Sequence, residues 1–376
     1  MRKPKVLIVY HYIALYREPI FHALSQADDS IYYFASCVKS NNDIKLIGKD
    51  SCVYDEKIFL ELENIWLPKG FLWQKKLLTI LDDNKFDRVI FLGDPHFIST
   101  WFALCKLRLM GTKTYLWTHG FVGRSNKFQD YLKLKMYSLC NGVLLYGEQA
   151  KKDLINAGVS ASKLSVIYNS LDYEKQKKIR DTLTELELFN VKKKLFLNHS
   201  HLQLFFVGRL TKHKELGMLI DAVNKLKNKG VFINVLFIGD GEASDDLKGK
   251  VSNYSIEEQF NFYGSTHDEH ELANLICSSD VCVAPGEVGL TAMHSLAYGV
   301  PVITHNNRLK QMPEYESVIH NETGLLFEYG SIDSLVDNIE KSITLIGVEC
   351  KERCISIIES KYNPNTQVSL ISDALR

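Results

Sequence analysis

The chain has 376 residues, of which 45% are hydrophobic and 24% are charged. This composition is ordinary for a globular protein, and the length predicts two domains. The 45 basic and 45 acidic residues balance, which argues against a nucleic-acid-binding protein, and no segment approaches the roughly 20 apolar residues of a membrane span.

Apolar runs of strand length alternate with helical periodicity along the whole chain. Predicted strands cover residues 5–10, 31–36, 88–94, 114–120, 142–148, 165–170, 202–208, 234–241, 260–265, 281–286, 301–306 and 324–330. Continuous apolar strands that alternate with helices form parallel sheets covered on both faces, so the chain is predicted to be an α/β protein. The two series of strands indicate two doubly wound, Rossmann-like domains that face each other across a cleft.

The first apolar run and the cysteines indicate the cellular compartment of the protein. The run KVLIVY is interrupted too early for a signal peptide, so it predicts a buried first strand. The eight cysteines include no C-x-x-C pair, which favours reduced thiols over a disulfide framework or a metal site. We therefore expect a cytoplasmic protein.

A basic, aromatic-rich stretch spans residues 106–135. It has one acid, Asp130, and seven basic residues: Lys106, Arg108, Lys113, Arg124, Lys127, Lys133 and Lys135. Such a surface suits anionic lipid headgroups and predicts peripheral contact with the cytoplasmic face of the membrane. A solvated helix face with an ordinary core side is the alternative.

The domain boundary is predicted from a charge-dense segment. Residues 1–172 are expected to form the N-terminal domain, 173–200 the linker and 201–358 the C-terminal domain. Residues 359–376 are amphipathic, so we expect a terminal helix that packs back on the N-terminal domain.

Two cations follow the predicted strand 202–208. Arg209 and Lys214 lie five residues apart across a strand-to-helix turn, and Lys214 is expected in the first helical turn. Cations at a helix N-terminus oppose the helix dipole, so their presence suggests a bound anion. A pair of solvated surface charges is the alternative.

A second strand-to-helix turn, PGEVGLTAMHSLAYG, begins at residue 285. Gly286 and Gly289 bracket a tight turn, and Leu290 begins a short helix. The amides of Gly289, Leu290 and Thr291 are expected to form an anion nest. An ordinary joint of strand and helix has the same glycine spacing and stays an alternative.

Other candidate residues end predicted strands, where ligands bind in open α/β sheets. They are His119, Gly208 and Gly241. His119 is a candidate catalytic residue, and a satisfied structural histidine is the alternative. The pairs of histidines at 199 and 201 and at 267 and 270 are expected to be solvated, so no metal site is predicted.

These motifs together resemble those of the retaining GT-B glycosyltransferases of group 1, family four, which have a glycogen-synthase-like C-terminal domain. GRLTKHK matches the G-R-L-x-x-x-K motif, and APGEVGLTAMHSLAYGVPVIT matches the donor-binding E-x7-E region. LFIGDGE, NETGLLF, VIYNSLDY and THG match further family segments, so the resemblance covers both domains. It implies that Arg209 and Lys214 bind the donor diphosphate and that His119 lies beside the transferred sugar and the acceptor.

The chain departs from the family at three places. Gly286 stands at the first motif glutamate, and Glu287 can replace that carboxylate only if the loop is shifted by one residue. His294 stands at the second glutamate, where it either hydrogen-bonds the ribose or packs internally. The usual glycine-rich loop after the first strand is missing, and Tyr16 and Arg17 are expected to take over part of its work on the acceptor side.

The resemblance predicts a hexosyltransferase that needs neither a cofactor nor a metal. It would transfer a sugar from a nucleotide-diphosphate sugar to a hydroxyl of a glycan or lipid-linked glycan, with retention, in the synthesis of bacterial lipopolysaccharide or capsule. The cationic turn and the helix end would neutralise the departing diphosphate.

Three alternatives remain open at this point. A sugar-nucleotide 2-epimerase of similar fold would need carboxylates around the sugar, and the missing glutamate at Gly286 speaks against it. A non-catalytic binding module would tolerate the lost glutamates. A nicotinamide dehydrogenase would need a fingerprint whose third glycine is absent after Gly241.

Overall fold

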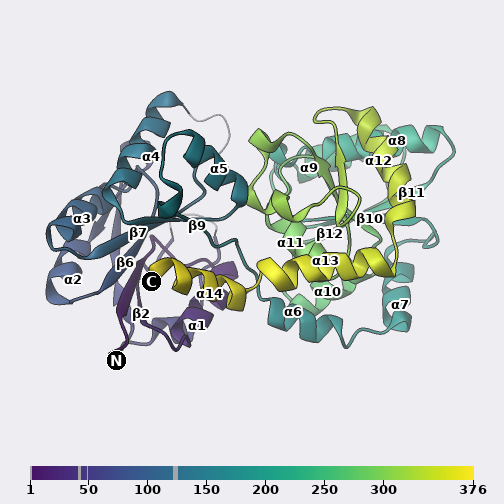
Figure 1. Ribbon diagram of the computed structural model, residues 1–376. Coiled ribbons are helices and arrows are strands. Elements are labelled where there is room, and N and C mark those ends of the chain that lie inside the picture. The colour runs from purple at the N-terminus through teal and green to yellow at the C-terminus, as the bar shows by residue number, and fades with distance from the viewer. Residues whose placement is uncertain (1, 41–43, 49, 122–125) are drawn as a thin grey trace. The chain divides into compact units, whose positions relative to one another are not determined.

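The computed structural model describes residues 2–40, 44–48, 50–121 and 126–376. The chain forms two compact units, each built on its own parallel sheet (Figure 1). Unit 1 comprises Met1–Asp172 and Asn363–Arg376, and unit 2 comprises Tyr173–Tyr362. The predicted class, an α/β protein with two Rossmann-like halves, is confirmed.

Unit 1 has, within the described residues, a seven-stranded parallel sheet with the order β3-β2-β1-β6-β7-β8-β9. Its strands are β1 (Lys5–Val9), β2 (Ile31–Ser36), β3 (Phe59–Glu61), β6 (Arg88–Leu92), β7 (Lys113–Thr118), β8 (Gly142–Leu145) and β9 (Leu164–Val166). Its helices are α1 (Glu18–Ser25), α2 (Leu77–Asp83), α3 (Ile98–Leu109), α4 (Lys127–Leu139), α5 (Glu148–Asn156) and α14 (Pro364–Leu375). Arg124 of the basic stretch lies outside the described residues.

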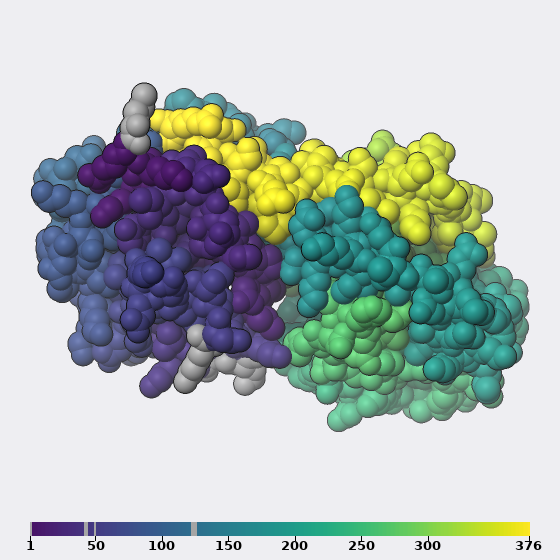
Figure 2. All heavy atoms as spheres, turned by 90° about the horizontal axis from the view of Figure 1, so that it is seen from below, coloured from purple at the N-terminus to yellow at the C-terminus, as the bar shows by residue number. Residues whose placement is uncertain are grey.

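The sheet of unit 1 buries apolar side chains on both faces because its strands are apolar at nearly every position. Val6 and Ile8 on one face pack with α1 and α14, whereas Leu7 and Val9 on the other face belong to the cluster with α2 to α5. Helix α14 contributes Ile371 to the first face. In Figure 2 its yellow atoms lie directly against the purple N-terminal segment of unit 1.

Unit 2 has a six-stranded parallel sheet, counted within the described residues, with the order β12-β11-β10-β13-β14-β15. Its strands are β10 (Leu202–Val207), β11 (Ile233–Ile238), β12 (Phe260–Gly264), β13 (Val281–Ala284), β14 (Val302–His305) and β15 (Gly324–Phe327). Its helices are α6 (Tyr173–Arg180), α7 (Glu185–Leu195), α8 (Gly217–Asn228), α9 (Ser244–Asn253), α10 (Glu269–Cys277), α11 (Leu290–Ala297), α12 (Ile332–Leu345) and α13 (Val348–Lys361).

The segments expected as a linker and as a terminal helix are placed as follows. Residues 173–200 contain α6 and α7 and belong to unit 2. Helix α13 continues to Lys361, so residues 359–362 also belong to unit 2, and α14 alone joins unit 1.

Short elements complete the two units. Strands β4 (Glu63–Leu67) and β5 (Phe71–Lys75) pair as an antiparallel hairpin. The 3-10 turns are η1 (Leu15–Arg17), η2 (Cys52–Tyr54), η3 (Pro68–Gly70), η4 (Ala161–Lys163), η5 (Lys212–Lys214), η6 (Glu257–Gln259), η7 (Arg308–Lys310) and η8 (Pro313–Ser317). The hairpin and β3 were not predicted, because β4 is exposed at four of its five positions and so lacks a continuous apolar run.

Candidate functional site

Each sheet has a point where the strand order reverses. In unit 2 the chain moves from β10 outward to β11 and β12 and then returns to β13 on the other side of β10. In unit 1 the same reversal lies between β1 and β6. Ligands of open α/β sheets bind outside the carboxyl ends of the strands at such switch points. The loops after β10 and β13 are therefore the candidate site of unit 2, and they are the two segments singled out in the sequence.

The loop after β10 differs from the prediction in one respect. Lys214 does not lie in the first turn of a long helix but ends the separate turn η5. Glu215 follows in the left-handed conformation, with φ of 51°, and α8 begins only at Gly217. Buried side chains hold this extra turn on the unit, because Leu210 and Leu216 are 1% and 2% exposed.

The loops after β10 and β13 are joined backbone to backbone. The N–H of Gly286 donates to the carbonyl oxygen of Lys214 at 2.9 Å, and the Lys214 ammonium donates to the carbonyl oxygen of Glu287 at 2.9 Å. A Cβ atom at Gly286 would lie only 2.2 Å from the carbonyl oxygen of His213. A side chain at position 286 would therefore force the two loops apart.

Glu287 carries the carboxylate nearest to this junction. Its side chain is 33% exposed and lies 3.3 Å from the Lys214 ammonium through Oε1. The carboxylate thus partly neutralises Lys214. Lys214 retains 14% side-chain exposure, so it is held in a fixed position at the loop rather than extended into solvent.

Arg209 has no such partner. Its side chain is exposed, and it makes no hydrogen bond or ion pair with any residue in the described part of the chain. It follows Gly208, whose φ of 143° turns the chain away from the strand direction at the end of β10. The loop after β10 therefore carries a guanidinium that has no side-chain partner among the described residues and an ammonium that is anchored to the loop after β13.

The start of α11 provides fewer open amides than predicted. The N–H of Thr291 donates to the carbonyl oxygen of Val288 at 3.2 Å, so it does not contribute to an anion nest. The N–H groups of Gly289 and Leu290 make no hydrogen bond with any described residue. Thr291 instead fixes the helix to β10, because its hydroxyl donates to the carbonyl oxygen of Val207 at 2.7 Å.

Gly241 lies behind the loop after β10 and supports it. A Cβ atom at position 241 would come within 2.4 Å of the carbonyl oxygen of Leu210. The N–H of Leu210 donates to the carbonyl oxygen of Asp240 at 3.0 Å, so the loops after β10 and β11 continue to pair beyond the strands. The structure gives Gly241 a supporting role and shows no open N–H there, since its amide donates to the Asp240 side chain at 2.7 Å.

Gln311 holds the loop after β13 and was not predicted. Its Oε1 accepts from the N–H of Val288 at 2.9 Å, and its Nε2 donates to the Thr304 hydroxyl at 2.9 Å. Thr304 lies in β14, and its hydroxyl donates in turn to the carbonyl oxygen of Ala284 at 2.9 Å. A glutamine in the turn after a strand carries no sequence signal that separates it from a surface residue.

His294 lies one turn into α11 and faces neighbouring helices. Its Nδ1 is 3.4 Å from Nε2 of Gln176 on α6, and the same Nε2 donates to Glu269 of α10 at 3.0 Å. Burial lowers the pKa of His294, and the carboxylate of Glu269 opposes that shift. The hydroxyl of Tyr298 also donates to Glu269, at 2.7 Å. The histidine belongs to an internal polar cluster with these residues.

His119 follows β7 at the carboxyl edge of unit 1. Its ring lies 4.4 Å from the ring of Tyr146, which follows β8. Burial lowers the pKa of His119 to about 4, and the positive charges of Arg17 and Lys133 lower it further. The imidazole is therefore neutral at pH 7 and can accept or donate a hydrogen bond without carrying charge.

Tyr16 and Arg17, the predicted acceptor-side pair, end η1 and differ in exposure. The Tyr16 ring is 46% exposed, whereas Arg17 is 5% exposed. Arg17 donates to Asn169 Oδ1 at 3.1 Å and to the hydroxyl of Tyr146. The structure thus brings Arg17 together with His119 through Tyr146. Tyr146 and Asn169 were missed, although each is a polar residue near the carboxyl end of a predicted strand, and that position is the signal that could have identified them.

His11 and Asp94 flank the switch point of unit 1. They follow β1 and β6, the two strands between which the order reverses. Burial lowers the pKa of His11 to about 4, and the Asp94 charge opposes this shift. Asp94 Oδ1 also accepts from the N–H of His96 at 2.9 Å and lies 2.8 Å from His96 Nδ1. His11 directly follows one predicted strand and Asp94 ends another, and neither was singled out.

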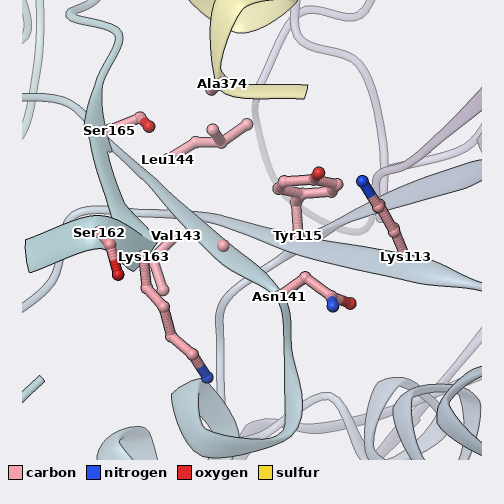
Figure 3. A pocket seen from close by; sticks show the side chains of 10 residues that line it. Lys113, Tyr115, Asn141, Val143, Leu144, Ser162, Lys163, Ser165 and Ala374 are labelled. Carbon is pink, nitrogen blue, oxygen red and sulfur yellow. The ribbon is translucent and has the colours of Figure 1, made fainter. Parts of the chain in front are cut away.

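The opposite edge of the unit 1 sheet carries a small polar pocket of about 240 Å³ (Figure 3). It lies at the amino ends of β7, β8 and β9, away from the edge where His119 and Arg17 lie. Lys113 and Lys163 line it with their side chains pointing in opposite directions, so they do not converge on one ligand (Figure 3). Among the described residues, no group of His, Cys, Asp or Glu side chains is arranged to hold a metal ion.

The neutral histidines predict a dependence of stability on pH. The pKa values of His11, His119 and His305 are about 4 because these rings are buried, whereas an unfolded histidine titrates near 6.5. Between these values the unfolded chain binds more protons, so the free energy of unfolding should fall as the pH is lowered from about 6.5 to 4. Urea unfolding at several pH values measures this. The free energy of unfolding should change less steeply with pH in the His119→Asn variant. A free energy of unfolding that stays constant from pH 7 to 5 would contradict the low pKa values of these histidines.

Comparison with known proteins adds a family match. Residues 189–357 match the family model described as "Glycosyl transferases group 1". An uncharacterised 41.2 kDa protein in the cps region of Klebsiella pneumoniae is 25% identical over 305 residues, which cover 78% of this chain and 79% of that protein. A GDP-mannose-dependent alpha-(1-6)-phosphatidylinositol dimannoside mannosyltransferase of Mycobacterium tuberculosis is 35% identical over 103 residues, but these cover only 27% of this chain and 26% of that enzyme.

The fold also has solved relatives. The crystal structure of HepE from Anabaena in complex with UDP superposes with a TM-score of 0.75 and 14% identity, over 100% of this chain and 99% of that chain. This likeness covers both units and confirms the predicted GT-B fold. No described helix combines the length and the apolar character that crossing a membrane requires.

Proposed function

We propose that the chain is a group 1 glycosyltransferase, because residues 189–357 match that family model and both units share the GT-B fold. On this premise it transfers a hexose from a nucleotide-diphosphate sugar to a hydroxyl group. The acceptor is a glycan or a lipid-linked glycan of a bacterial surface polysaccharide, and the anomeric configuration is retained. The relative from a cps region supports the role in surface polysaccharide synthesis.

The observation that carries this proposal is the free guanidinium of Arg209 at the switch point of unit 2. It lies in the loop after β10, and Lys214 in the same loop is bonded to the loop after β13. Two open amides, those of Gly289 and Leu290, begin the helix that follows. Two cations and a helix N-terminus suit a diphosphate that gains negative charge as it leaves the sugar.

The remaining residues have proposed roles in binding. His119 of unit 1, neutral at pH 7, hydrogen-bonds the transferred sugar or the attacking hydroxyl. Arg209 and Lys214 stabilise the departing diphosphate, whose oxygen takes the proton of the acceptor hydroxyl. These cations supply the charge that a divalent metal supplies in other transferases, so we expect activity to persist in EDTA.

A product assay tests the proposal against its alternatives. The protein is incubated with UDP-, GDP-, dTDP- and ADP-linked sugars in the presence of EDTA. A glycosyltransferase releases the nucleoside diphosphate from one of them, by transfer or by slow hydrolysis. A 2-epimerase isomerises the sugar without releasing it, and a binding module leaves every donor unchanged; either result would refute the proposal.

We also propose that unit 1 contacts an anionic membrane surface through α3 and α4. Phe102 and Leu109 of α3 are 56% and 90% exposed, and Phe128 and Tyr131 of α4 are 64% and 54% exposed. The ammonium of Lys135 lies 5.3 Å from the centre of the Tyr131 ring, one turn further along α4. Exposed aromatic rings beside cations suit the interface between headgroups and acyl chains.

Vesicle sedimentation measures this contact. The protein is expected to bind vesicles with anionic lipid and not neutral vesicles, and Lys135→Gln should weaken binding about fivefold, since one basic residue near such a surface contributes about 1 kcal/mol. Phe128→Ala should weaken it as well. Phe189→Ala removes a ring that is 50% exposed on α7 of unit 2 and serves as the control. Equal binding to both kinds of vesicle would contradict the proposal.

A further inference from the structure

Arg17 is a buried cation without a carboxylate partner. It is 5% exposed, and it forms no ion pair with any acidic side chain in the described part of the chain. Its hydrogen bonds to the Asn169 amide and the Tyr146 hydroxyl go to neutral oxygens. A buried charge without an ionic partner costs several kcal/mol, so its retention needs a physical explanation.

Aromatic rings surround the guanidinium and stabilise it only in part. Its Cζ lies 5.5, 5.6 and 5.0 Å from the ring centres of Tyr16, Trp117 and Tyr146. Burial raises the pKa of both Tyr10 and Tyr146, so the neighbouring phenols stay neutral and supply no negative charge. Contacts between a cation and aromatic rings recover less free energy than burying the charge costs.

The guanidinium lies where a ligand of unit 1 is expected. Arg17 ends the turn that follows β1, and its partners Tyr146 and Asn169 follow β8 and β9. All three therefore lie at the carboxyl edge of the sheet. The ring of His119 contacts Tyr146 at the same edge.

The side chains named at this edge of the sheet carry more positive than negative charge. Lys133 adds a second cation, because its ammonium donates to the carbonyl oxygen of Gly120 at 2.9 Å. The positive charges of Arg17 and Lys133 both lower the pKa of His119, so both cations act on the His119 imidazole. Asp94 is the acid that follows β6, and it is engaged by His96.

We propose that unit 1 binds an acceptor that carries an oxyanion, a carboxylate or a phosphate, and that Arg17 is the residue that pairs with it. This inference rests on the proposed transferase function, and it names the class of acceptor: an acidic sugar or a phosphorylated carrier. Tyr16, whose exposed ring lies against the guanidinium, covers the pair from solvent. The acidic acceptor completes the charge balance that the chain leaves open.

Titration with a matched pair of sugars tests this inference. D-glucuronate and D-glucose share a ring and differ only in the carboxylate at C6, and inorganic phosphate is the second anionic probe. The side-chain N–H resonance of Arg17, assigned from the Arg17→Lys variant, is followed by NMR at constant ionic strength. Glucuronate or phosphate should shift it, glucose should not, and the anion should bind about tenfold to a hundredfold more weakly to Arg17→Gln.

Two controls separate charge from folding. Lys113→Gln removes a positive charge at the opposite edge of the same sheet (Figure 3), and it should leave anion binding unchanged. Arg17→Lys keeps the charge and should retain part of the affinity even if Arg17→Gln folds poorly. The melting temperature of each variant shows whether unit 1 is intact.

Three results would overturn the inference. If neither anion moves the Arg17 resonance of the wild-type protein, the guanidinium is structural. If Arg17→Gln weakens UDP or GDP tenfold while glucuronate has no effect, Arg17 meets the donor diphosphate instead. If glucose binds as well as glucuronate, the acceptor needs no charge. Failure of the proposed transferase function would look different. No donor would then release its nucleoside diphosphate, although the anions would still bind at Arg17.

Discussion

Arg209→Ala should lower kcat/KM for the nucleotide-sugar donor by about a hundredfold to a thousandfold, the usual effect of removing one group that stabilises transition-state charge. The guanidinium is exposed and bonds to no described residue, so its removal should leave the melting temperature unchanged. Lost activity with preserved stability is what distinguishes a ligand-binding cation from a structural one. Release of the nucleoside diphosphate, measured beside thermal unfolding, gives both quantities.

Lys212→Ala is the matched control for this experiment. Lys212 lies in η5 with Lys214, and its side chain is exposed. The Lys212→Ala variant should therefore turn over the donor nearly as fast as the wild-type protein does. Lys214→Ala should lower both activity and melting temperature, because it also removes the bond to the loop after β13. If Arg209→Ala turns over the donor as well as Lys212→Ala does, the diphosphate assignment is wrong.

Gly286→Ala should impair donor binding and stability together. The added Cβ would lie 2.2 Å from the carbonyl oxygen of His213 and 2.8 Å from Cα of Lys214. Both contacts are with backbone, so the loop after β10 must move, at a cost of about 1–3 kcal/mol or more. The displacement separates Lys214 from Glu287. Gly286→Glu, which restores the family glutamate, should be worse and should not improve activity.

Gly249→Ala is the matched control for Gly286→Ala. Gly249 is an exposed residue of α9, and a Cβ there meets nothing within 4 Å. Alanine is the better helix former, so this variant should be more stable by about 1 kcal/mol. Chemical denaturation of the two variants gives the difference. A Gly286→Ala protein with wild-type stability and donor affinity would show that the two loops are not packed as described.

The fold could be predicted because its strands are apolar throughout. Runs such as LQLFFV and KVLIVY are buried on both faces, and strands of that kind form the centre of a parallel sheet. The hairpin of β4 and β5 could not be predicted, since its outward side chains follow no apolar alternation. The order of strands in each sheet, and with it the switch points, was likewise not readable from the runs alone.

The candidate site could be predicted only to the level of its loops. Strand ends, glycines and cations identified the loops after β10 and β13, which the structure does bring together through Gly286 and Lys214. The sequence does not show which amides stay open, because that depends on local backbone geometry. The N–H of Thr291, for example, is occupied by the carbonyl oxygen of Val288. The burial of Arg17 depends on three strands that are distant in sequence, so no motif could indicate it.

The central claim is that the loops after β10 and β13 hold the donor diphosphate. A crystal structure of the protein with the nucleoside diphosphate that raises its melting temperature most tests this directly. We predict phosphate oxygens within hydrogen-bond distance of the Arg209 guanidinium, the Lys214 ammonium and the N–H groups of Gly289 and Leu290. A diphosphate bound elsewhere, with Arg209 still directed into solvent, would contradict the account.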